Sequence, residues 1–266
     1  MSTTRARVTS SIAIDTCRDG DRAALIGYLP FGYPNIETSI AAARTMAQAG
    51  VDIVELGLPY TDPVLDGPVI QQAAEQALAQ GVRTRDIFGA VESIADTGAA
   101  VLVMSYYNPI LRYGVDSFAR DLASSGGAGL ITPDLVPDEG AEWITASDAH
   151  DLDRVFLVAP SSTPERLALT SAASRGFVYA ASVMGVTGTR TSVGDAAERL
   201  VRDTREAGAT NVCVGLGVST PEQAAEIARY ADGVIVGSAL VRALGPEGDL
   251  RALEKTVAAL AQAVGK

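Results

Sequence analysis

Short apolar runs alternate with amphipathic stretches along almost the whole chain, and this pattern constrains the fold more than any other feature. The runs expected to form buried strands are residues 23–29, 51–57, 99–105, 129–132, 154–159, 177–182, 211–215 and 234–236. Helical patterns lie at 35–49, 68–80, 84–96, 116–125, 139–150, 163–174, 195–207, 220–230 and 250–264. Eight strands, each followed by a helix, in 266 residues favour a (β/α)8 TIM barrel of the α/β class.

Alternation along a sequence does not show whether the sheet closes, so an open doubly wound sheet is the alternative. Against that alternative, no GxGxxG motif opens a helix after the first expected strand. No proline- or serine-rich linker and no block of like charges divides the chain, and 47% of its residues are hydrophobic. We therefore expect residues 1–266 to form one barrel domain with extra helical segments near its ends.

The net charge of −11 limits the possible partners of the chain. Nucleic acids and anionic membranes would be repelled at long range, so any phosphate must be held locally, for example by backbone N–H groups. Cys17 and Cys213 are too few for a disulfide framework, and no stretch has the pattern of a signal peptide or membrane span, which predicts a cytoplasmic protein. His150, the single histidine, is expected to end a helix, and no metal site is expected.

Two acidic residues lie at the end of the second expected strand and in the loop after it. Glu55 stands within the apolar run, where an unpaired charge costs several kcal/mol, and Asp66 follows in a loop rich in proline and glycine. A purely structural reading has Glu55 bonded to a neighbouring hydroxyl or amide and Asp66 capping the next helix. Because barrels carry their catalytic groups at the C-terminal ends of strands, we favour acid–base catalysis, with a raised pKa for Glu55.

Glycine-rich loops follow the last three expected strands, and they form a second candidate site. The sequence reads GVTG from Gly185 to Gly188, then Gly215-Leu216-Gly217, then Gly237-Ser238. Each glycine by itself is typical of a turn. Together they would let backbone N–H groups approach one phosphate from several sides, as barrels often do near their last strands.

Aromatic and amide side chains stand at other strand ends. Tyr28, Tyr106, Tyr107, Asn108 and Tyr179 could line a pocket for a flat heteroaromatic ligand. The alternative is that they pack at the barrel rim with their hydroxyl groups in solvent.

Six motifs point to one family. ELGLPYTDPVLDGPVIQ, PFGYP, SYYNPI, GVTGTR, VGLGVSTPEQ and VGSALV occur in the order found in the tryptophan synthase α subunit, and they span most of the chain. The chain therefore resembles this family. The resemblance implies a lyase of tryptophan biosynthesis that cleaves indole-3-glycerol phosphate by a retro-aldol step into indole and D-glyceraldehyde 3-phosphate. It implies no metal and no organic cofactor in this chain.

The resemblance also implies roles for individual residues. Glu55 would shuttle a proton between indole C3 and the glycerol hydroxyl, and Asp66 would engage the indole N–H as positive charge develops. Thr187 would order Asp66 when the GVTG loop closes. The implied substrate-binding residues are Tyr28, Met104, Tyr179 and Thr187, and the implied phosphate-binding residues are Gly188, Gly217, Gly237 and Ser238.

A partner is implied as well, namely a pyridoxal-phosphate β subunit in an α2β2 assembly, with PFGYPN, SYYNPI and TPDLVPDE in the loops that face it. Two other functions stay open. The chain could be another phosphate-binding barrel enzyme, acting on a related indole or thiazole phosphate, or a regulatory subunit without turnover. Retention of both acids argues against the regulatory reading.

Overall fold

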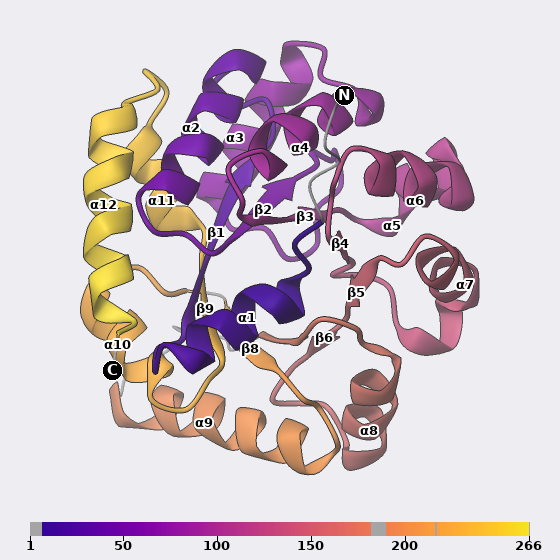
Figure 1. The fold of residues 1–266 in the computed structure, drawn as a ribbon, viewed down its shortest axis with the longest axis vertical. Helices are drawn as coiled ribbons and strands as arrows, with labels where there is room; N and C mark the ends of the chain where they lie inside the picture. Colours follow the sequence, from indigo (N-terminus) through magenta and orange to yellow (C-terminus); the bar gives the residue numbers. More distant parts are fainter. Residues whose placement is uncertain (1–6, 182–189, 216, 266) are drawn as a thin grey trace.

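In the described part of the chain, nine strands of the computed structural model form one parallel sheet that curves into a barrel (Figure 1). The structure describes residues 7–181, 190–215 and 217–265. Along the sheet the strand order is β5-β4-β3-β2-β1-β9-β8-β7-β6. The strands are β1 (Ala24–Pro30), β2 (Ile53–Gly57), β3 (Ala100–Met104), β4 (Gly129–Ile131), β5 (Asp153–Val155), β6 (Leu157–Val158), β7 (Val178–Ala181), β8 (Val212–Gly215) and β9 (Gly233–Val236).

Closure of the barrel depends on Phe156. The two ends of the strand order, β5 and β6, are separated along the chain by this one residue, whose carbonyl accepts a hydrogen bond of 3.0 Å from the Tyr179 N–H. The segment expected as one strand at 154–159 is therefore divided, pairing with β4 on one side and β7 on the other. The open doubly wound sheet is thus the wrong alternative, and the barrel is confirmed.

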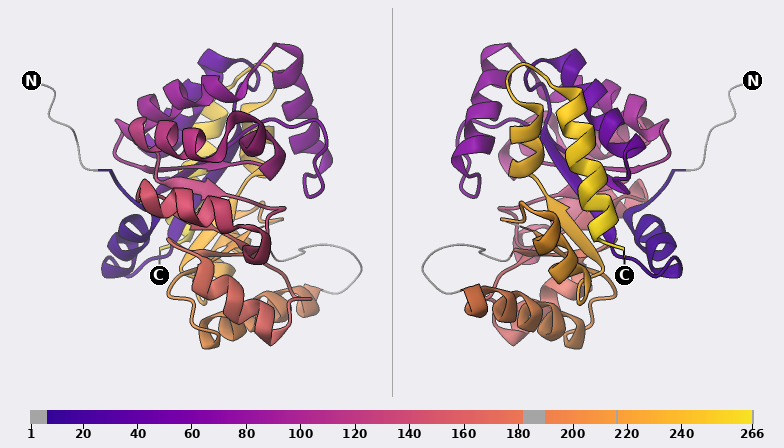
Figure 2. Two further views of the ribbon diagram at one scale, coloured as in Figure 1. Left: turned by 90° about the vertical axis from the view of Figure 1, so that its right-hand side faces the viewer. Right: turned by 90° about the vertical axis from the view of Figure 1, so that its left-hand side faces the viewer.

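Helices surround the barrel, and α1 crosses the end nearest the viewer in Figure 1. Their bounds are α1 (Ser10–Asp19), α2 (Ile36–Gln48), α3 (Pro68–Ala79), α4 (Ile87–Ala95), α5 (Tyr107–Tyr113), α6 (Val115–Ser124), α7 (Ala141–Ala149), α8 (Pro164–Ala173), α9 (Arg190–Glu206), α10 (Pro221–Ala228), α11 (Ser238–Leu244) and α12 (Leu250–Ala263), with the 3-10 turns η1 (Thr84–Asp86) and η2 (Pro137–Glu139). Figure 2 shows the same arrangement from two sides. No helix in the described ranges combines the length and apolarity needed to cross a bilayer.

Several helix ends follow local sequence signals. The Asn35 side chain accepts a hydrogen bond of 2.8 Å from the Thr38 N–H, which caps α2. Thr163 and Thr220 cap α8 and α10 in the same way, each followed by proline at the first helical position. His150 ends α7, again as predicted.

The barrel has two apolar layers because strand side chains alternate between its inside and its outside. The inner layer contains Ile26, Ile53, Leu102 and Ile131, and the outer layer packs against the surrounding helices. Helix α1 closes the inner layer at one end with Ala13, Ile14 and Cys17. The opposite end, at the carboxyl ends of the strands, stays open for a site.

Three helices were not predicted individually. For α1 the reason is its mixed sequence, in which only a narrow stripe is buried. Both α5 and α11 have seven residues and begin almost directly after a strand, so neither shows a separate helical period. The expected helix at 84–96 begins as the turn η1, and the one at 139–150 begins at Ala141 after η2.

Candidate functional site

The inner face of the barrel continues into a cavity at the carboxyl ends of the strands. Glu55 lies two residues beyond the inner-layer residue Ile53, and Tyr28 lies two beyond Ile26, so both side chains face inward. In the register of β1 and β2, Tyr28 is directly opposite Glu55. Strand alternation alone thus brings these two polar groups together.

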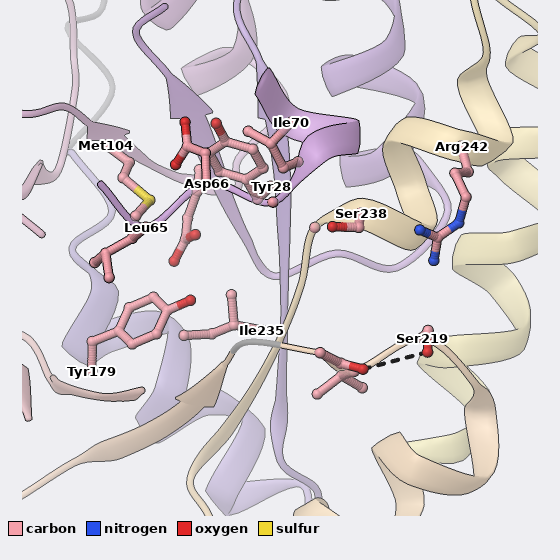
Figure 3. Close-up of a pocket in the computed structure, with 15 residues that line it drawn as sticks. Tyr28, Leu65, Asp66, Ile70, Met104, Tyr179, Ser219, Ile235, Ser238 and Arg242 are labelled. Atoms are coloured by element: carbon pink, nitrogen blue, oxygen red, sulfur yellow. Dashed lines mark hydrogen bonds between the residues drawn. The ribbon is translucent and has the colours of Figure 1, made fainter. Parts of the chain in front are cut away.

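The cavity has a volume of about 300 Å³ and two distinct ends. Figure 3 shows Asp66, Met104 and Tyr179 toward one side of it. Ser219, Ser238 and Arg242 lie toward the other side. The residues that line the cavity are Tyr28, Glu55, Leu65, Asp66, Gly67, Ile70, Met104, Tyr179, Gly217, Val218, Ser219, Ile235, Gly237, Ser238 and Arg242.

Glu55 is fully buried, and both of its carboxyl oxygens lack a hydrogen-bond partner among the described residues. The alternative in which a neighbouring hydroxyl or amide bonds to this side chain is therefore wrong for the residues that the structure describes. Burial raises the pKa of Glu55 to about 8, because the charged form loses its hydration. At neutral pH the group is a protonated acid that becomes a base on losing one proton.

Asp66 is half-buried in the irregular loop between β2 and α3. Its Oδ1 accepts a hydrogen bond of 3.1 Å from the Tyr106 hydroxyl. The N-cap of α3 is Gly67, with no side-chain cap, so the reading of Asp66 as a helix cap is wrong. Burial raises the pKa of Asp66, and the hydrogen bond from Tyr106 opposes that rise.

Two glycines make room for the tyrosines of the cavity. A side-chain carbon at Gly57 would overlap the Tyr28 hydroxyl, and one at Gly215 would overlap the Tyr179 hydroxyl. Burial raises the pKa of both phenols well above its usual range, so both stay neutral. The rim-packing alternative is wrong for these two tyrosines.

The remaining rim candidates differ among themselves. Tyr106 is 5% exposed and bonded to Asp66, so rim packing is wrong for it too. Asn108 is exposed and donates a hydrogen bond of 3.1 Å to the Tyr60 hydroxyl, and Tyr107 is half-buried. Neither Tyr107 nor Asn108 lines the cavity.

The phosphate candidates Gly217, Gly237 and Ser238 gather at the other end, as expected for the last βα loops. Gly217 has φ +93°, a conformation that favours glycine. Thr187 and Gly188, the other two candidates, lie outside the described residues.

Arg242 and Ser219 are the polar lining residues that sequence reasoning missed. Arg242 is exposed on α11, four residues after Ser238 and hence on the same helical face. Recognising α11 as a helix would have supplied that signal. In the described part of the chain no ion pair or hydrogen bond engages the Arg242 guanidinium.

The chemistry of the donor set suits an anionic ligand with a polar ring better than a metal ion. No group of three or more histidine, cysteine, aspartate or glutamate side chains is arranged for a metal within the described ranges. One end of the cavity offers carboxyl and phenol groups, and the other offers hydroxyl, glycine backbone and guanidinium groups.

Comparison with known proteins gives a consistent result. The family described as tryptophan synthase alpha chain matches residues 14–265. The tryptophan synthase alpha chain of Mycobacterium marinum is 63% identical over 247 residues, covering 92% of this chain and 91% of that protein. A structure of Mycobacterium tuberculosis tryptophan synthase aligns with a TM-score of 0.91 at 56% identity, covering 98% and 100% of the two chains. The alpha subunit from Legionella pneumophila, at 28% identity, aligns with a TM-score of 0.87 over 96% and 97%.

Proposed function

The chain belongs to the tryptophan synthase alpha chain family, and we propose that the cavity between Asp66 and Arg242 is its active site. The chain is a carbon–carbon lyase of tryptophan biosynthesis, which cleaves indole-3-glycerol phosphate into indole and D-glyceraldehyde 3-phosphate. The observation that carries the assignment of the site is Glu55, whose buried carboxyl group lines the cavity and has no hydrogen-bond partner among the residues that the structure describes.

The two ends of the cavity suggest how the substrate lies. We propose that the indole ring occupies the end lined by Tyr28, Met104 and Tyr179, where the surfaces are apolar or aromatic. The phosphate then reaches Gly217, Gly237 and Ser238, where backbone N–H groups can approach it closely. Thr187 and Gly188 stay proposals from the family resemblance alone.

Cleavage requires one proton to move onto the ring and one to leave the glycerol chain. In our proposal protonated Glu55 donates its proton to indole C3, and the ring becomes a cation. The C3′ hydroxyl then loses its proton to the Glu55 carboxylate as the C3–C3′ bond breaks, and the bonding electrons return to the ring. The products are indole and an aldehyde, and Glu55 regains its starting proton.

Asp66 complements this step. As the ring gains positive charge its N–H becomes more acidic, and a carboxylate that accepts that hydrogen bond stabilises the cation. Asp66 lines the cavity together with Glu55, so one acid can handle protons while the other handles charge. Burial raises the pKa of Asp66, and the hydrogen bond from the Tyr106 hydroxyl opposes that rise by stabilising the carboxylate form that this role requires.

The reaction moves protons and one electron pair without net oxidation or reduction. Glu55 and Asp66 can supply the proton transfers and the charge stabilisation, and on the family resemblance we propose that this chain needs no metal and no organic cofactor, and that pyridoxal phosphate belongs to the partner β subunit. The family implies such a partner, and we propose an α2β2 assembly with the loops PFGYPN, SYYNPI and TPDLVPDE toward it. The two cysteines are buried free thiols, which supports the proposal of a cytoplasmic location.

The direct test of this function is indole release by the purified chain from indole-3-glycerol phosphate, with and without the tryptophan synthase beta chain of the same organism. We expect indole in both cases and more with the partner, at a rate unchanged by a metal chelator. A chain that only activates the partner's own reaction would support the regulatory alternative. Faster turnover of a different indole or thiazole phosphate than of indole-3-glycerol phosphate would support the alternative of another phosphate-binding barrel enzyme.

A further inference from the structure

The Tyr106 hydroxyl lies among the residues of the loop that carries Asp66. It is 3.1 Å from the Val64 N, 3.0 Å from the Leu65 N and 3.1 Å from Asp66 Oδ1. Two of these neighbours are N–H donors, so the phenol oxygen accepts from both of them. Its own proton is left to donate to the Asp66 carboxylate, which uses the full hydrogen-bonding capacity of the hydroxyl.

Tyr106 is itself anchored on rigid structure. It stands between the end of β3 and the start of α5 and is 5% exposed. Its backbone carbonyl accepts a hydrogen bond of 2.8 Å from the Ser105 hydroxyl. The Tyr60 ring packs against its ring with centroids 5.2 Å apart. The Tyr106 hydroxyl therefore has a well-defined position, and the three consecutive loop residues Val64, Leu65 and Asp66 form hydrogen bonds with it.

Among the described residues, few other contacts fix the position of this loop. Val64 is 73% exposed and Leu65 is 43% exposed, so burial of these side chains does not hold the segment. The Asp66 carbonyl accepts a hydrogen bond of 2.9 Å from the Gln71 side chain of α3, which fixes the backbone but not the carboxylate. In the described part of the chain, Tyr106 is the partner of the Asp66 carboxylate.

We propose that Tyr106 is a positioning residue for cleavage, whose hydroxyl fixes the Asp66 carboxylate and the two amides before it against rigid β3. This inference rests on the proposed role of Asp66. Tyr106 does not line the cavity, so it acts through Asp66 and does not touch substrate.

The hydrogen bond has an electrical consequence with a definite sign. A donor to the ionised form lowers the pKa of Asp66, while burial raises it. The other groups that face this cavity are Tyr28 from β1, Glu55 from β2 and Tyr179 from β7, with Arg242 at the far end. None of these supplies a cation beside Asp66, so removing the Tyr106 hydroxyl leaves burial unopposed and the pKa of Asp66 rises.

The test is Tyr106→Phe, assayed as the full chain in complex with its beta chain. We expect kcat/KM for indole-3-glycerol phosphate to fall on the order of tenfold or more, because a misplaced acid loses alignment. The acidic limb of the pH profile should move to higher pH, while the basic limb stays in place.

Tyr113→Phe is the matched control, since the Tyr113 hydroxyl also donates a hydrogen bond of 2.6 Å to an aspartate, Asp121, but does so far from the cavity. It should leave both limbs unchanged.

A double-mutant cycle with Asp66→Asn separates positioning from general damage. If Tyr106 acts through Asp66, Tyr106→Phe has little further effect on kcat/KM once Asp66 is neutral. Equal losses in both backgrounds, or a Tyr106→Phe profile identical to wild type, would overturn the inference. Failure of the proposed function is a different result, because the wild-type complex would then release no indole.

Discussion

Glu55 shows most clearly how function shapes this chain at the scale of one residue. An apolar side chain would fill the same inward position of β2 without any cost of dehydration. The carboxyl group is kept protonated instead, with a pKa of about 8 in the fold against an ordinary value of 4.5. Because this carboxyl group holds its proton more tightly in the folded state, the free energy of unfolding decreases as the pH rises from 4.5 to about 8.

Glu55→Gln should therefore stabilise the protein as it removes turnover. Glutamine cannot ionise, so at pH 8 the free energy of unfolding should exceed that of wild type by on the order of 2–4 kcal/mol. Most of the wild-type loss accumulates as the pH rises from 5 to 8, so near pH 5 the difference in unfolding free energy between the two proteins should be small. Urea unfolding at the two pH values measures this, and a variant less stable than wild type at pH 8 would contradict the raised pKa.

At the scale of elements, the active-site shape depends on glycines at strand ends. Gly57 ends β2 beside the Tyr28 hydroxyl, and Gly215 ends β8 beside the Tyr179 hydroxyl. The small residue on one strand thus leaves room for the aromatic residue of its neighbour.

Gly57→Ala should displace Tyr28 from its place opposite Glu55. We expect a loss of about 1–3 kcal/mol in the free energy of unfolding, typical of overpacking, together with a higher KM for indole-3-glycerol phosphate. Gly89→Ala is the control, because Gly89 lies on α4 with open space around it. That change should stabilise the helix by about 0.5–1 kcal/mol and leave KM alone. The idea fails if Gly57→Ala binds substrate like wild type.

Local signals in the sequence predicted some of these elements and site residues but not others. Strands such as β2 and β8, and caps such as Asn35 and Thr220, have strong local signals, and Glu55 stood out because it interrupts an apolar run. The short helix α11 has no such signal, and Arg242 was missed with it. The hydrogen bond between Tyr106 and Asp66 joins residues 40 positions apart, so only the folded barrel brings it into view.

At the scale of the whole molecule, both ends of the chain contribute to one barrel. Strand β1 lies between β2 and β9, and α12 packs against α2, which supports our proposal of one domain over residues 1–266. Closure also places the two acids and the last loops on one face. The net charge of −11 on the chain repels an anionic substrate at long range, so attraction for phosphate must be local.

Arg242 is our candidate for that local attraction. Arg242→Gln should raise KM for indole-3-glycerol phosphate about threefold to tenfold, as loss of an exposed charged hydrogen bond would, with kcat nearly unchanged. In the reverse direction KM for glyceraldehyde 3-phosphate should rise, and KM for indole should not. Arg229→Gln removes a comparable exposed charge at the end of α10 and should change neither. A rise in KM for indole alone would place Arg242 elsewhere.

In our proposal one buried carboxyl group, Glu55, moves both protons of the reaction. The most direct test of this proposal is the rate of indole release by wild type and Glu55→Gln across pH, in complex with the beta chain and with binding of that chain confirmed for both. Wild-type activity should fall as the pH passes about 8, and Glu55→Gln should release almost no indole at any pH. A folded, partner-bound Glu55→Gln variant with turnover close to wild type would contradict it.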